Sequence, residues 1–124
     1  MFFSFKLEAE MQVKRELSAA ECAGILANGG WVLSHTRNIK HWALRTGLIN
    51  EAFEKNGNLY VSAQNSRAEI TGSFVLTHPW CIEVRGSYKH KLEKRSGGFR
   101  YVGKRSCTHR FFNDEIARKM TARE

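Results

Sequence analysis

Hydrophobic and polar residues alternate almost without exception from residue 3 to residue 13. A period of two puts successive side chains on opposite faces of an extended chain, so this segment is predicted to be a long β-strand with one face on a core. The apolar face would hold the following residues: Phe3, Phe5, Leu7, Ala9, Met11 and Val13.

Helix signals follow this strand. Ser18 is a good N-cap, and Glu21 three residues later completes a capping box. This helix is predicted to end at about Ala27, before two glycines that tolerate a left-handed cap. A second helix is predicted over residues 36–47, with Thr36 as its cap.

Two further helical segments are expected nearer the C-terminus. Residues 51–55 are predicted to form a helical turn that stops at Asn56-Gly57. Asn113 is predicted to cap a terminal helix, since Asp114 and Glu115 follow it and acidic residues favour the first helical turn.

The remaining hydrophobic segments are predicted to be strands, with a turn at Ser96-Gly97-Gly98. The expected fold is therefore α+β: a mainly antiparallel sheet of about five strands with two or three short helices, in a single domain of residues 1–124. The predicted strands after the first are residues 31–34, 58–63, 69–77, 81–92 and 99–109. The predicted core comprises Phe3, Phe5, Leu7, Met11, Ile25, Leu26, Trp42, Val75, Ile82 and Val84.

Composition supports a folded cytoplasmic protein. With 42% hydrophobic residues, the chain of 124 residues has enough apolar side chains for a core. No run of residues is long and apolar enough for a membrane helix, and the N-terminus lacks the basic start of a signal peptide. The three cysteines are an odd number without metal-site spacing, so we expect free thiols, no metal and no cofactor.

Positive charge is concentrated in one segment. The net charge is +8, yet residues 1–83 hold eight basic and eight acidic side chains, and residues 111–124 hold three of each. Residues 84–110 hold nine basic side chains and one acid, Glu93, and so account for the whole excess. Such a segregated charge attracts polyanions.

Residues 84–110 are predicted to form a cationic β-hairpin. If residue 92 pairs near residue 99, the apolar faces of the two strands coincide, and six cations share the other face. Arginine and lysine on such a surface suit the phosphates of nucleic acid. The predicted contact residues are Arg85, Lys89, Lys91, Arg100, Lys104 and Arg110.

The leading functional prediction is a small basic protein that binds DNA or RNA through this hairpin, of the kind used as an accessory by phages or mobile elements. An inhibitor or adaptor that binds an acidic protein is an alternative, because its surface would carry the same charge. Lysines can also protect sheet edges from aggregation without any ligand. Oligomeric state is left open.

An enzyme acting on nucleic acid or nucleotides is the other alternative. A metal-independent nuclease needs a general acid, a general base and a cation, which two histidines in a basic cleft could supply. His35, His90 and His109 are the candidates, although the predicted alternation puts His90 and His109 on the core side. No catalytic residue is assigned.

Residues 18–49 resemble the helix-turn-helix of small excisionase-type DNA-binding proteins, in the segments 18–23, 35–42 and 47–49. The resemblance implies that the second helix enters the major groove. Here about eight residues separate the two helices, where the family has a much shorter turn. On this resemblance the groove-facing residues would be Arg37, Asn38, Lys40, His41 and Arg45.

An overlapping segment is similar to small ADP-ribosyltransferases. The order His35-Thr36, Gly47-Leu48 and Tyr60-Val61-Ser62 matches the strand-end, helix-end and short-strand motifs of that family. The resemblance implies a catalytic glutamate, for which Glu69 and Glu83 are candidates.

Overall fold

The computed structural model describes residues 12–35, 48–63, 66–94 and 97–121. The predicted strand at residues 3–13 therefore lies almost wholly outside the described residues, and the predicted helix at residues 36–47 lies outside them entirely. The same holds for half of the predicted core, namely Phe3, Phe5, Leu7, Met11 and Trp42.

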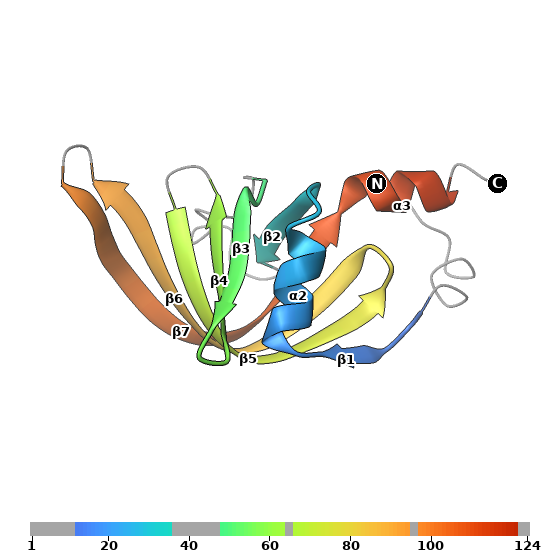
Figure 1. Ribbon diagram of the computed structural model, residues 1–124, viewed down its shortest axis with the longest axis horizontal. Coiled ribbons are helices and arrows are strands. Elements are labelled where there is room, and N and C mark those ends of the chain that lie inside the picture. The colour runs from blue at the N-terminus through green and yellow to red at the C-terminus, as the bar shows by residue number, and fades with distance from the viewer. Residues whose placement is uncertain (1–11, 36–47, 64–65, 95–96, 122–124) are drawn as a thin grey trace.

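A curved antiparallel sheet of seven strands dominates the described chain, and two helices accompany it (Figure 1). The α+β prediction is confirmed at this level, with more strands than the five expected. The strand order is β2-β7-β6-β5-β4-β3. The seventh strand, β1, is not part of this order and pairs with β5. The elements are β1 (Arg15–Leu17), α2 (Ala19–Leu26), β2 (Trp31–His35), β3 (Glu51–Lys55), β4 (Asn58–Ala63), β5 (Ser66–His78), β6 (Cys81–Lys94), β7 (Gly98–Asn113) and α3 (Asp114–Thr121).

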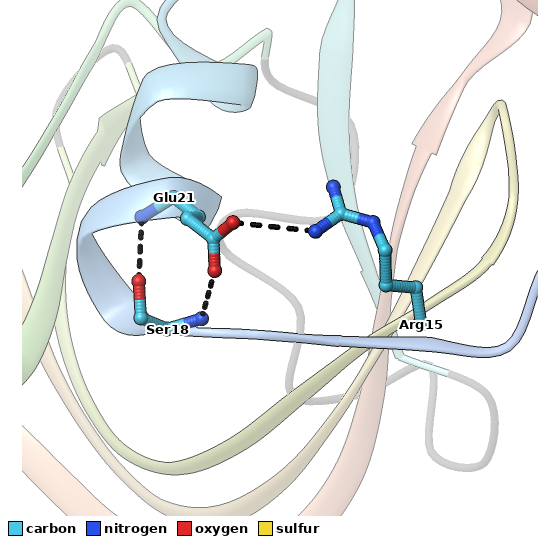
Figure 2. Close-up of polar contacts among 3 residues, drawn as sticks. All are labelled: Arg15, Ser18 and Glu21. Carbon is cyan, nitrogen blue, oxygen red and sulfur yellow. Dashed lines mark hydrogen bonds and ion pairs between the residues drawn. The ribbon is translucent and has the colours of Figure 1, made fainter.

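The capping box at the start of α2 is present as predicted (Figure 2). The Glu21 amide donates to Ser18 Oγ over 3.0 Å, and the Ser18 amide donates to Glu21 Oε1 over 2.9 Å. Arg15 adds an ion pair, with its Nη1 3.2 Å from Glu21 Oε2. The Ser18 amide, and secondarily Arg15, lower the pKa of Glu21 because they favour its charged form. These contacts fix where the chain turns from β1 into α2.

The helical turn predicted at residues 51–55 is wrong, because this segment is strand β3. It pairs with β4 through a tight hairpin at Asn56-Gly57, where φ is 54° and 83°. Two central residues with positive φ are typical of the type I′ turn that matches the twist of antiparallel strands. The Gly57 amide also donates to Glu54 Oε2 over 2.7 Å, which stabilises the turn.

A pair of glycines lies near the middle of β5 and β6, where Gly72 and Gly86 face each other. A Cβ on Gly72 would lie 2.8 Å from Gly86 Cα and would overlap the Arg85 carbonyl oxygen. A Cβ on Gly86 would likewise overlap the carbonyl of Thr71. Only glycine permits this approach of the two backbones. Figure 1 shows the long strands β5, β6 and β7 bending, with α2 on the concave side.

The core lies between the sheet and α2. Leu26 of α2 packs among buried residues of the sheet that include Leu59, Ile70 and Ile82. Among the described residues of the predicted core, Leu26, Ile82 and Val84 are confirmed as buried, and Ile25 is partly buried against them. We call the sheet face that carries these side chains the inner face.

Val75 is the exception to the predicted core. It is half-buried and pairs with Glu16 and Glu83, so it lies on the opposite face, which we call the outer face. Its neighbour Phe74 takes the buried position, with 2% of its surface exposed. The strand was predicted correctly, but this residue was assigned to the wrong face, since strand side chains alternate.

Asn113 ends β7 and caps α3, as predicted. Its Oδ1 accepts the amide of Ile116 over 3.0 Å, and its Nδ2 donates to the Gly29 carbonyl over 3.0 Å. This one side chain therefore joins the start of α3 to the loop before β2. A second, smaller core of Trp80, Cys81 and Ala117 packs α3 against the end of the β5–β6 hairpin.

Candidate nucleic-acid interface

The predicted hairpin is formed by β6 and β7, which pair along their whole length from Cys81↔Phe112 to Lys94↔Gly98. Residues paired across an antiparallel ladder share a face, and the faces alternate along each strand. Since Val84 and Tyr88 are buried on the inner face, the odd-numbered positions of β6 lie on the outer face. Arg85 and Lys91 are accordingly exposed, and Lys89 is half-buried.

The register also assigns Lys104 and Arg110 to the outer face, because they pair with Lys89 and Glu83. Arg110 is half-buried, and the side chain of Lys104 lies outside the described part of the structure. Five of the six predicted cations thus occupy outer-face positions.

Arg100 is separated from the other five by a β-bulge. The ladder shifts between His90↔Gly103 and Lys91↔Tyr101, so β7 contains one extra residue, Val102. An extra residue reverses the alternation beyond it. Arg100 consequently pairs with Leu92, one residue from the predicted register, and its backbone position belongs with the inner face. The side chain of Arg100 lies outside the described part of the structure.

Two of the predicted cations are engaged by an acid. Arg85 Nε lies 3.3 Å from Glu83 Oε1, and Arg110 Nη2 lies 3.7 Å from Glu83 Oε2. Glu83 lies one residue before the basic segment 84–110 and is therefore not among the charges of that segment. The cationic character of this end of the hairpin is therefore smaller than the sequence predicted.

Arg67 on β5 is a cation that the sequence analysis missed. It is exposed on the outer face and pairs directly with Lys91 of β6. Lys89 of β6 pairs with Glu69 of β5 on one side and with Lys104 of β7 on the other. We call Arg67, Lys89, Lys91 and Lys104 the cationic cluster. No signal in the sequence around residue 67 reveals this arrangement, because it depends on the β5–β6 register.

Glu69 borders the cationic cluster and is held by polar neighbours. Asn58 Nδ2 donates to Glu69 Oε2 over 3.0 Å, and Thr71 Oγ1 donates to Asn58 Oδ1 over 3.0 Å. Tyr60 pairs with Glu69 across β4 and β5. Loss of hydration, followed by the contact with Glu69, raises the pKa of Tyr60.

Of the three candidate catalytic histidines, the structure describes the side chain of His109 alone. His109 is 1% exposed, and its ring contacts that of Tyr88 with centroids 4.8 Å apart, so it belongs to the inner face as the alternation predicted. The backbone of His35 pairs with that of His109 across β2 and β7. The side chains of His35 and His90 lie outside the described part of the structure.

The described cysteines are buried thiols. Burial raises the pKa of Cys22 to about 12, which leaves it protonated and unreactive. Cys81 is also buried, whereas the side chain of Cys107 lies outside the described part. Within residues 12–35, 48–63, 66–94 and 97–121, no three His, Cys, Asp or Glu side chains cluster closely enough to hold a metal ion. Neither described helix has the length and hydrophobicity needed to span a membrane.

No family model, curated protein or solved structure matches the chain. The fold can be compared with the resemblances to a helix-turn-helix and to ADP-ribosyltransferases. The segment after α2 is strand β2, paired with β7, where a helix-turn-helix needs a turn, and the groove-facing residues 37–45 lie outside the described residues. The two candidate glutamates of the transferase resemblance, Glu69 and Glu83, both lie on the outer face among the contacts given above.

Proposed function

We propose that this protein binds nucleic acid through the outer face of β5, β6 and β7, with phosphates on the cationic cluster. One observation carries the proposal: Arg67 and Lys91, both exposed, are direct cross-strand partners. Lys89 and Lys104 form a second like-charged pair in the neighbouring row. Like charges directly opposite each other repel, so an anionic ligand over these positions would be attracted by both members of a pair.

The geometry of the cluster suits a chain of phosphates. Neighbouring strands lie about 4.8 Å apart, and same-face residues along a strand lie about 6.7 Å apart. The four positions therefore form a compact grid over three adjacent strands, in which several phosphates can be contacted at once. A single small anion would need fewer cations.

Protection of an exposed edge does not account for three of the four cations in the cluster. Lysines that prevent aggregation belong on edge strands. Strand β5 lies between β4 and β6, and β6 lies between β5 and β7, so Arg67, Lys89 and Lys91 are all on interior strands. Their charge therefore favours a ligand that approaches the outer face of the sheet.

Salt titration of binding tests the proposal. With about four contacts, the slope of log affinity against log salt is expected to be roughly −3 to −5, because each neutralised phosphate releases counterions. Replacing Lys89 and Lys104 by glutamine should make the slope shallower by about two, and should weaken all sequences alike. Arg67→Gln with Lys91→Gln should have the same effect.

Lys119→Gln is the matched control, since Lys119 is an exposed cation on α3 and its loss should leave the slope almost unchanged. The proposal is wrong if random duplex, single-stranded DNA and RNA all bind more weakly than about 100 µM at about 100 mM salt, the weak limit of ordinary non-specific binding. An acidic protein would then be the partner to seek for the same face.

A further inference from the structure

An aromatic pair lies on the same outer face as the cationic cluster. Phe53 of β3 and Tyr60 of β4 are cross-strand partners, with ring centroids 5.2 Å apart and ring planes 7° from parallel. Phe53 is 45% exposed, and no other aromatic residue whose side chain the structure describes is as exposed. A stacked ring open to solvent on a polar sheet face is a surface on which a planar group can stack.

The aromatic pair and the cations are close together. Tyr60 pairs with Glu69, and Arg67 is two residues from Glu69 on the same face, so Arg67 is a diagonal neighbour of Tyr60. Such diagonal neighbours lie about 7–8 Å apart. Arg67 in turn pairs with Lys91, so a path across the outer face runs from the exposed ring to the phosphate-binding cations.

We propose that the nucleic acid bound here is single-stranded, with a base stacked on the Phe53–Tyr60 pair and its neighbouring phosphates on Arg67 and Lys91. This inference rests on the proposed function. Bases in a duplex are stacked on one another and cannot reach a ring on a protein surface, whereas unpaired bases can. Aromatic platforms beside a cationic groove are the general means of binding single strands without sequence preference.

Glu69 directs the path of the strand. Its carboxylate lies between Tyr60 and Lys89 in the same cross-strand row, and it repels phosphate there. The next row holds Arg67 and Lys91 and is cationic. A single strand is therefore expected to leave the aromatic pair diagonally, over Arg67, and not straight along the row of Glu69.

The experiment compares a short oligothymidylate with an abasic oligomer of the same length, which keeps the phosphates and lacks the bases. Unmodified protein is expected to bind the oligothymidylate about tenfold or more tightly than the abasic oligomer, since stacking of one base contributes on this order. Phe53→Leu keeps apolar volume and removes the ring, and it should abolish the difference while leaving abasic binding unchanged. Phe53→Tyr should retain the difference.

Leu48→Ala is the control, because Leu48 is an exposed apolar residue near β2 and its truncation should change neither affinity. Equal affinity for the two oligomers, or tighter binding of duplex than of oligothymidylate, overturns the single-strand inference while the phosphate contacts of Arg67 and Lys91 still stand. Failure of both oligomers and duplex to bind would instead refute the proposed function itself.

Discussion

The sheet has two halves in which the arginines and lysines of the outer face have different neighbours. On one side of the Gly72–Gly86 pair, β5 and β7 are flanked by β1 and β2; we call this the base half. On the other side β5 pairs with β4, which in turn pairs with β3, and the β6–β7 hairpin runs out to the far end of the sheet (Figure 1); we call this the arm half. Both halves carry arginine or lysine on the outer face.

The two halves differ in the charged groups that lie beside the cations. In the base half, Arg85 and Arg110 share the carboxylate of Glu83. In the arm half, Arg67 stands opposite Lys91, while Lys89 stands between Lys104 on one side and Glu69 on the other. Surface ion pairs contribute little to stability, but they neutralise charge locally. Cross-strand register, more than the number of basic residues, therefore decides how the positive charge is distributed over the outer face.

The largest expected effect concerns the packing of the base half. Ile82 is fully buried, and Ile82→Ala should lower the free energy of unfolding by about 2–5 kcal/mol, because it removes core volume. Val75→Ala, on the outer face of the same half, should cost far less. Denaturant titration measures both. Similar costs for the two variants would contradict the assignment of inner and outer faces.

A smaller effect is expected at the bend that separates the halves. Gly86→Ala puts a Cβ against the Thr71 carbonyl and Gly72 Cα, and overpacking of this kind costs about 1–3 kcal/mol. Because the obstacle is backbone, a side-chain rearrangement cannot relieve it. Gly97→Ala is the matched control, since Gly97 has open space around its Cβ position. If thermal unfolding shows both variants to be equally stable, the close approach at the bend is not needed.

Local signals predicted the parts of the fold that depend on a few neighbouring residues. Ser18 with Glu21 and Asn113 with Ile116 form caps whose partners are three residues apart, so the sequence alone revealed them. Segment 51–55 failed because Glu, Ala and Lys favour helices, while pairing with β4 overrides that preference. Asn56-Gly57 was the overlooked signal, since this dipeptide between two short segments is typical of a hairpin.

The candidate site could be predicted only in part, because it depends on register. Parity within β6 correctly separated Arg85, Lys89 and Lys91 from the buried residues. The bulge at Val102 moved Arg100 to the other parity, and no residue pattern in the sequence marks it. Arg67 comes from β5, the strand just before the hairpin, and it lies two residues outside the predicted strand 69–77. Its place opposite Lys91 depends on the register between β5 and β6, which composition and periodicity do not give.

The smallest expected effect sharpens the comparison of the two halves. Glu83→Gln removes the carboxylate that Arg85 and Arg110 share, so both guanidinium groups become available to phosphate. Affinity for oligothymidylate should rise by about twofold to fivefold, consistent with the modest strength of surface ion pairs. The salt slope should steepen by at most about one, because one or two weak contacts are gained.

Glu115→Gln makes the same charge change at an exposed position on α3 and is the control for a general effect of net charge. A gain in affinity that is specific to Glu83→Gln would mean that the bound strand extends from the arm half across the bend. Equal results for the two variants would confine the ligand to the arm half. In that case Arg85 and Arg110 serve only to hold Glu83, and the contact surface consists of the cationic cluster with the aromatic pair beside it.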